Sequence, residues 1–305
     1  MKETKEYPQI KQPPVTRVSL ANILVATDFS PCAENALDYA LIIARRFDSR
    51  IYLTHVLTPD AYAFVPPEAA TVTHGALRQA AEQKLADILI SGRLREAPHE
   101  VVLEEGFLWP TIEKLIKKYE IDLIVVGTHG AKKIEKLLLG SGAEEIFRRA
   151  ACPVMTVGPR FAGEPARTAE WKNILFATDL EQTPDRAAAY AFSLAQEYQA
   201  RLTLLHVATR HGTASERELA AKREAVLQRL QGLIPPGSAL WCDPEMAVSF
   251  GSAPEEIMNM ARARNMDLIV MGARAGGGGL GTHNPFATTY RVVCEAACPV
   301  LTVKS

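Results

Sequence analysis

The chain has 305 residues, of which 48% are hydrophobic and 23% charged, and its formal net charge at pH 7 is −1. This length favours two ordinary domains, and the balanced charge gives no field to attract nucleic acid or an anionic membrane. No stretch is apolar for long enough to cross a bilayer, and the first residues lack the apolar run of a secretory leader. The five cysteines are expected to be reduced thiols. We therefore expect a cytoplasmic protein.

The sequence repeats itself in the second half of the chain. Segment 22–30, NILVATDFS, matches NILFATDLE at 173–181, which begins 151 residues later. Three further segments also recur, at 51–56 and 202–207, at 121–130 and 266–275, and at 150–157 and 296–303. This duplication predicts two similar domains at 18–158 and 171–305, with a flexible N-terminal extension at 1–17 and a linker at 159–170.

Each repeat predicts strands that alternate with helices. After the first apolar run, Ala and Leu recur at helical spacing between Ala36 and Ala44, with Ser30 and Pro31 at the positions of an N-cap and a first helical residue. The run DLIVVG at 122–127 is apolar on consecutive residues, which is typical of a strand buried on both faces of a parallel sheet. Further helices are predicted at 75–90, 110–119, 215–233 and 254–264, and further strands at 101–106, 154–157, 247–251, 267–272 and 300–303.

Asp28 stands directly after the first predicted strand. Open parallel sheets bind ligands beyond the carboxyl ends of their strands, so a residue at this place is a candidate for ligand binding. Its carboxylate could accept hydrogen bonds from the hydroxyls of a ribose. Taken alone, an Asp at this position more readily caps the helix that follows. Both roles remain open from the sequence.

A glycine pattern follows the fourth strand of the first repeat. Gly127 and Gly130 permit a close backbone approach to an anion, and Gly140 and Ser141 open a helix whose free amides favour a phosphate.

Charged residues around this pattern have conflicting effects. Lys132 and Lys133 could offset phosphate charge, or they could belong to a solvated face. Glu144 and Glu145 would repel a phosphate unless they turn aside. The sequence does not decide between these possibilities.

The pattern Gly127-x2-Gly130-x9-Gly140-Ser141, with Asp28 after the first strand, resembles the ATP-binding signature of the universal stress protein family. The resemblance covers both repeats. It implies two tandem Rossmann-like α/β domains of the adenine nucleotide alpha hydrolase type. Each would be a five-stranded parallel sheet of order 3-2-1-4-5 with helices on both faces. It also implies that ATP is the ligand, with a role in stress regulation, and leaves the presence of Mg²⁺ open.

The resemblance also implies a set of nucleotide-binding residues. Asp28 and Ala26 would meet the adenosine, Val56 would contact adenine through its backbone, and Val126 would line the base. Backbone amides of the glycine pattern would surround the ribose and phosphates. The complete set is Ala26, Thr27, Asp28, Val56, Val126, Gly127, Gly130, Gly140, Ser141, Gly142 and Ala143, with Lys132 and Lys133 near the phosphate charge.

The second repeat has lost part of this signature. Asp179, Val207 and Gly272 are retained, but Ala275 stands opposite Gly130, and Phe286 and Ala287 stand opposite Gly140 and Ser141. A bulky Phe286 would obstruct a close backbone approach. We therefore expect the second repeat to bind ATP weakly or not at all.

Three functions are compatible with these features. The first is regulation of an unidentified protein partner by bound ATP. The second is slow ATP hydrolysis, with Ser141 near a metal ion, although no base to orient water is evident. The third is a nucleotide-free scaffold whose last strands, 154–157 and 300–303, pair edge to edge. No catalytic residue or metal ligand is identified, His55 and His206 are expected to be structural, and dimerisation of the tandem chain is left open.

Overall fold

The computed structural model describes residues 18–59, 66–128, 139–158, 171–181, 186–208, 215–236, 238, 242–273 and 288–304. The chain divides into two units. One contains the first repeat and the last helix and strand of the chain, and the other contains most of the second repeat. The predicted N-terminal extension and linker, 1–17 and 159–170, lie outside the described residues.

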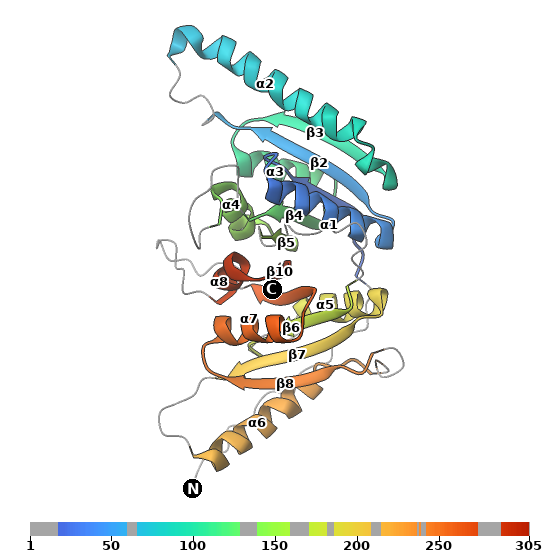
Figure 1. Ribbon diagram of the computed structural model, residues 1–305, viewed down its shortest axis with the longest axis vertical. Coiled ribbons are helices and arrows are strands. Elements are labelled where there is room, and N and C mark those ends of the chain that lie inside the picture. Colours follow the sequence, from blue (N-terminus) through green and yellow to red (C-terminus); the bar gives the residue numbers. More distant parts are fainter. Residues whose placement is uncertain are drawn as a thin grey trace. The chain divides into compact units, whose positions relative to one another are not determined.

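The sheet of the first unit has the strand order β3-β2-β1-β4-β5-β10 (Figure 1). Strands β1 to β5 are all parallel, which gives the predicted order 3-2-1-4-5. The inner residues of β1 and β4 are buried consecutively, as expected for strands covered on both faces. The strands are β1 (Asn22–Ala26), β2 (Arg50–Leu57), β3 (His99–Glu105), β4 (Leu123–Gly127), β5 (Val154–Val157) and β10 (Val300–Lys304).

Helices cover both faces of this sheet. Helix α1 packs against β1, β2, β4 and β5, α2 packs against β2 and β3, and α3 and α4 pack against each other. Right-handed crossovers place α1 and α2 on one face and α3 and α4 on the other. The helices are α1 (Pro31–Phe47), α2 (Pro67–Ile90), the 3₁₀ helix η2 (Arg93–Glu96), α3 (Leu108–Lys118), α4 (Ser141–Arg149) and α8 (Thr288–Glu295).

The last strands of the two repeats pair with each other. Strand β10 runs antiparallel to β5, which confirms the predicted edge-to-edge pairing. The Thr156 hydroxyl donates to the Val300 carbonyl at 3.3 Å, and the Thr302 hydroxyl donates to the Val154 carbonyl at 3.0 Å. These reciprocal bonds show the duplication in three dimensions, and the pairing covers the open edge of β5.

The second unit repeats the same strand order. Its parallel strands are ordered β8-β7-β6-β9, which corresponds to β3-β2-β1-β4 of the first unit. The strands are β6 (Asn173–Ala177), β7 (Arg201–Ala208), β8 (Glu245–Phe250) and β9 (Leu268–Ala273), and the helices are α5 (Arg186–Tyr198), α6 (Glu216–Gln231) and α7 (Ala253–Ala263).

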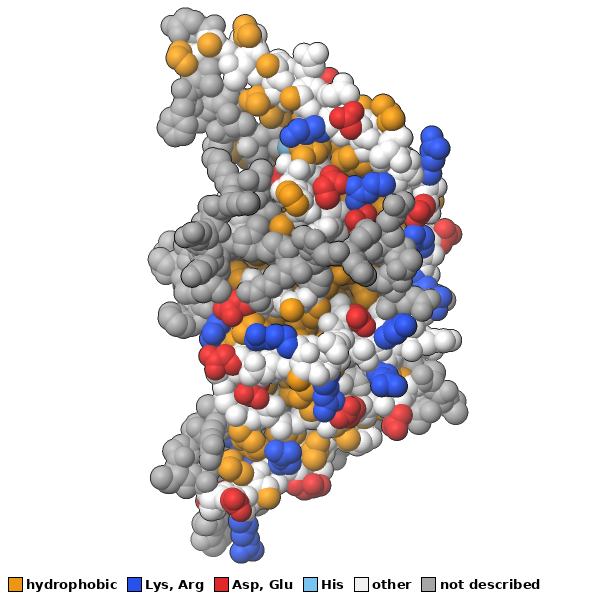
Figure 2. All heavy atoms as spheres, viewed as in Figure 1, with side chains coloured by type: hydrophobic (Ala, Val, Ile, Leu, Met, Phe, Trp, Pro, Cys, Tyr) orange, Lys and Arg blue, Asp and Glu red, His pale blue; other side chains and the backbone are white. Residues whose placement is uncertain are grey.

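The distribution of surface charge and the state of the cysteines agree with what the composition predicts. Acidic and basic side chains are interspersed over the described part of the face in Figure 2. All five cysteines are free thiols, as predicted. Within the described ranges, no helix is both long enough and apolar enough to span a membrane.

Helix α2 begins earlier than the sequence predicts. We expected a helix from residue 75, but α2 starts at Pro67, which occupies the first turn where its missing N–H is tolerated. Gly75 therefore lies inside the helix, on its exposed side. A glycine inside a helix weakens it without ending it when the flanking residues favour the helix.

Replacing Gly75 with alanine should stabilise the protein. A Cβ atom at this position would meet no heavy atom within 4 Å, so the substitution adds no clash. The unfolded chain loses backbone freedom, and the expected gain in the free energy of unfolding is about 0.5–1 kcal/mol. Urea unfolding of the Gly75→Ala variant checks this, and a lower midpoint than wild type would contradict it.

Candidate functional site

The candidate site lies where the strand order reverses between β1 and β4. Ala26 pairs with Val126, so both strands end at the same edge of the sheet. Gly127 brings the end of β4 against the first turn of α1, because a Cβ atom there would lie 2.6 Å from the Cys32 carbonyl carbon and 2.7 Å from the Ala33 nitrogen. This is the topological switch point, at which open α/β sheets bind ligands.

The loop after β1 is held by its own side chains. The Thr27 N–H donates to the Thr54 carbonyl at 2.9 Å, and the Phe29 N–H donates to Thr27 Oγ1 at 3.0 Å. The Ser30 N–H donates to Asp28 Oδ1, also at 3.0 Å. Phe29 has a φ of 63°, a left-handed conformation that is uncommon for a bulky residue. The loop that carries Asp28 is therefore fixed before any ligand binds.

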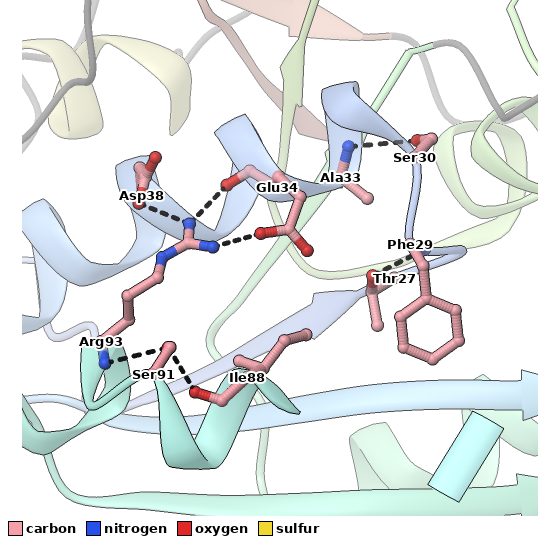
Figure 3. A network of polar contacts seen from close by, with 9 residues as sticks. All are labelled: Thr27, Phe29, Ser30, Ala33, Glu34, Asp38, Ile88, Ser91 and Arg93. Carbon is pink, nitrogen blue, oxygen red and sulfur yellow. Dashed lines mark hydrogen bonds and ion pairs between the residues drawn. The ribbon is translucent and has the colours of Figure 1, made fainter. Parts of the chain in front are cut away.

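Ser30, not Asp28, is the cap of helix α1. Its side chain accepts the Ala33 N–H at 3.2 Å (Figure 3). One carboxylate oxygen of Asp28 accepts the Ser30 N–H, and Asp28 is exposed. The capping role left open by the sequence is thus taken by Ser30, and the Asp28 carboxylate remains at the solvent side of the loop.

Arg93 connects the start of α1 to the end of α2. Its guanidinium binds the Glu34 carboxylate, the Glu34 carbonyl at 3.1 Å and Asp38 Oδ1 at 2.6 Å (Figure 3). Burial acts to lower the pKa of Arg93, but the bonds to Asp38 and Glu34 outweigh it and raise the pKa. The guanidinium stays charged. The first turns of α1, and with them the Asp28 loop, are thereby anchored.

His55 supports the same loop from β2. Its Nδ1 lies 2.8 Å from the Thr27 carbonyl, and its ring centroid lies 4.5 Å from that of Phe29. Burial lowers the pKa of His55, so the ring is neutral at pH 7 and donates Nδ1–H to the carbonyl. His206 makes the equivalent contact with the Thr178 carbonyl at 2.9 Å. Both histidines have the structural role that was predicted.

Helix α4 begins with amides for which the described part of the chain provides no acceptor. Gly140 is its N-cap and provides no side chain to accept them. Among the described residues, no acceptor is present for the N–H groups of Ser141, Gly142 and Ala143. The helix dipole adds partial positive charge at this end. Three free amides at a helix start form a ready site for an anion.

A backbone bond sets the position of this turn. The Gly140 N–H donates to the Thr128 carbonyl at 2.7 Å, and the Thr128 N–H donates to the Val157 carbonyl at 2.9 Å. Thr128 directly follows β4, so the start of α4 is held beside the end of that strand. Gly140 is thus held beside the end of β4, close to Gly127.

The acidic residues of α4 turn away from its N-terminus. Glu144 Oε1 lies 3.4 Å from Arg148 Nη1, and Glu145 Oε1 lies 3.6 Å from Arg149 Nη1. Both arginines lie one turn further along the helix. The conflict between an acidic first turn and a bound phosphate is therefore reduced by pairing each carboxylate with an arginine.

Comparison with known proteins agrees with this fold. The model of the universal stress protein family matches residues 20–158 and 170–304. The chain belongs to the universal stress protein family. Both repeats are therefore universal stress protein domains, and the resemblance derived from the glycine pattern is confirmed.

Similar proteins cover one repeat or both. A universal stress protein from Methanocaldococcus jannaschii is 29% identical over 136 residues, which are 44% of this chain and 80% of that protein. A universal stress protein structure from Archaeoglobus fulgidus has a TM-score of 0.69 at 20% identity and covers 93% of this chain and 98% of its own. A Pseudomonas aeruginosa protein described as functionally unknown has a TM-score of 0.61 at 18% identity and covers 94% of each chain. These structural similarities establish the fold.

The universal stress protein signature is only partly within the described residues. Gly130, Lys132 and Lys133 lie outside them, as do Ala275, Phe286 and Ala287 of the second repeat. Val56 is half-buried near the end of β2, and the Val126 side chain is buried in the core. The structure brings together two groups of predicted residues, at the ends of β1 and β4 and at the start of α4. These are Ala26, Thr27, Asp28, Val126, Gly127, Gly140, Ser141, Gly142 and Ala143.

Sequence reasoning missed three supports of the site. Thr128 contributes through its backbone, so its side chain gave no signal. Arg93 lies 55 residues from Asp38, a separation that no local motif encodes. The left-handed conformation of Phe29 was also unpredicted, although Leu180, at the matching position of the second repeat, has a φ of 60°. Because neither copy has a glycine at this position, no signal for this conformation was present in the sequence.

Proposed function

We propose that the first repeat of this universal stress protein binds ATP as a regulatory ligand. The observation that carries the proposal is the set of three amides at Ser141, Gly142 and Ala143, which find no acceptor among the described residues and are held beside the end of β4. An anion at this place gains hydrogen bonds and the favourable end of the helix dipole. The triphosphate of ATP supplies such an anion.

The other end of the site suits a nucleoside. The exposed Asp28 carboxylate can accept hydrogen bonds from ribose hydroxyls, since it is acceptor-only when ionised. Gly127 lets the end of β4 lie directly against the first turn of α1, next to the loop that carries Asp28. The backbone of Val56, near the end of β2, is the proposed contact for adenine. These residues fit a nucleotide laid across the switch point with its phosphates toward α4.

The surroundings of the proposed phosphate position favour binding without rapid turnover. Hydrolysis requires a group that orients a water molecule for attack. Of the described carboxylates in α4, Glu144 and Glu145 are each engaged by an arginine. We therefore favour a regulatory role, in which ATP occupancy alters the surface offered to a protein partner.

A series of nucleotides tests the proposed function. Affinity of the nucleotide-stripped protein should fall from ATP to ADP to AMP to adenosine, because each phosphate removed loses contacts with the α4 amides. Calorimetric titration at fixed salt gives the four dissociation constants, and GTP serves as the control for the base. Equal affinity for ATP and adenosine would show that the α4 turn holds no phosphate.

A further inference from the structure

Helix α8 of the second repeat contacts the turn that begins α4. The Leu139 N–H, directly before the N-cap Gly140, donates to the Tyr290 hydroxyl at 3.4 Å. Tyr290 is 8% exposed, so this contact is shielded from water. The two residues are 151 positions apart and belong to different repeats, although to the same structural unit. A residue of the second repeat thus reaches the proposed phosphate turn of the first.

Cys294 lies one turn after Tyr290 on α8 and reinforces the contact. The Tyr290 side chain and the Leu139 backbone are close enough to act on the pKa of the Cys294 thiol, and both act to lower it. Burial raises the pKa of Cys294 to about 11, and burial also raises the pKa of Tyr290. Both groups are therefore protonated and neutral at pH 7. They hold the turn without adding a negative charge that would repel a phosphate.

Two consecutive amides of the turn are held from opposite repeats. The Leu139 N–H is bound by Tyr290, and the Gly140 N–H is bound by the Thr128 carbonyl of the first repeat at 2.7 Å. The next three N–H groups, those of Ser141, Gly142 and Ala143, are the ones without an acceptor in the described ranges. Fixing the first two amides fixes the direction of those that follow, since the backbone is continuous.

The far end of α4 is also held by the second repeat. Lys304 Nζ, at the end of β10, donates to the Arg148 carbonyl at 2.7 Å. A lysine at the C-terminus of a helix also favours its dipole. Helix α4 is thereby restrained at both ends by elements from the second repeat.

We propose that Tyr290 is a positioning residue through which the second repeat pre-organises the phosphate-binding turn of the first. The inference rests on the proposed function. When the two repeats are aligned on their AACPV segments, Glu144 of the first repeat stands opposite Tyr290. The first repeat therefore has no tyrosine at this position with which to support the second repeat in the same way. The second repeat has exchanged its own glycine–serine pair for Phe286–Ala287 and supplies support to the neighbouring site instead of a second site.

A Tyr290→Phe substitution tests this role, because it keeps the ring and removes only the hydroxyl. One neutral hydrogen bond contributes modestly, so we expect ATP affinity to fall about three- to tenfold. Adenosine affinity should not change, since adenosine has no phosphate to place on the turn. Tyr119→Phe is the matched control, because its hydroxyl binds the exposed Glu100 and does not reach the turn. An equal loss for ATP and adenosine, or no loss for ATP, would overturn the positioning role.

Amide hydrogen exchange of the ligand-free protein separates this inference from the proposed function. Exchange of the Leu139 amide should be about tenfold faster in Tyr290→Phe than in wild type and unaltered in Tyr119→Phe. Unaltered exchange in Tyr290→Phe would overturn the contact even if ATP binds. Conversely, exchange could be faster in Tyr290→Phe while the wild-type protein binds no ATP. That result would uphold the contact but reject the proposed function, and with it the purpose assigned to Tyr290.

Discussion

A Ser141→Pro variant should bind ATP at least about tenfold more weakly than wild type. Ser141 is the first residue of α4, a position where proline is favoured because its N–H has no helical partner. Gly140 has a ψ of 144°, which a following proline accepts. The substitution therefore removes one amide and leaves the helix intact. A hydrogen bond to a charged group contributes about 1.5–3 kcal/mol, which corresponds to a tenfold or larger change.

The matched variant is Ser141→Ala, which keeps the amide and removes the hydroxyl. We expect it to lose at most a few-fold in ATP affinity if the backbone supplies the contact. Calorimetric titration of both variants with ATP and adenosine gives the comparison, and circular dichroism verifies that α4 persists. If Ser141→Pro binds ATP as wild type does, the α4 amides do not hold the phosphates.

Gly127→Ala should destabilise the first repeat by about 3 kcal/mol and abolish nucleotide binding. The new Cβ atom would overlap the backbone of Cys32 and Ala33 at 2.6–2.7 Å, and a backbone cannot rotate aside as a side chain can. Overpacking of this kind costs about 1–3 kcal/mol when side chains can move, so the upper end is expected. Relief requires α1 to move away from β4, which separates Asp28 from the phosphate turn.

Thermal and urea unfolding measure this effect. Gly75→Ala is the matched control, because the same chemical change at an open helix position should raise stability. A Gly127→Ala protein with wild-type stability and wild-type ATP affinity would show that the close approach of β4 to α1 is not required for the site.

The strand order was predictable because the sequence is duplicated. Two copies of each apolar run marked the parallel strands. A consecutive apolar run such as DLIVVG is typical of a strand that is buried on both faces of a parallel sheet. The start of α2 was not predictable to the same degree. Gly75 weakens the helical pattern of the sequence around it. Pro67 is favoured in the first turn of a helix, but a proline alone does not predict that a helix follows.

The candidate site could be predicted at its backbone positions and not at its supports. Glycines at fixed spacing report a backbone requirement, so Gly127 and Gly140 were identifiable from the sequence. Arg93 and Tyr290 act through contacts between segments that only the folded chain brings together. The choice between Ser30 and Asp28 as the helix cap was open for a similar reason: both residue types cap helices, and only the dihedral angles decide.

The number of ATP molecules bound per chain tests the central claim most directly. Calorimetric titration of nucleotide-stripped protein measures it together with the affinity. One site per chain, weakened by Ser141→Pro, is the predicted result, because the glycine pattern proposed to hold the phosphates is complete in the first repeat alone. Two equivalent sites per chain would contradict the account by restoring the second repeat as a binding domain, and the absence of any site would reject nucleotide binding itself.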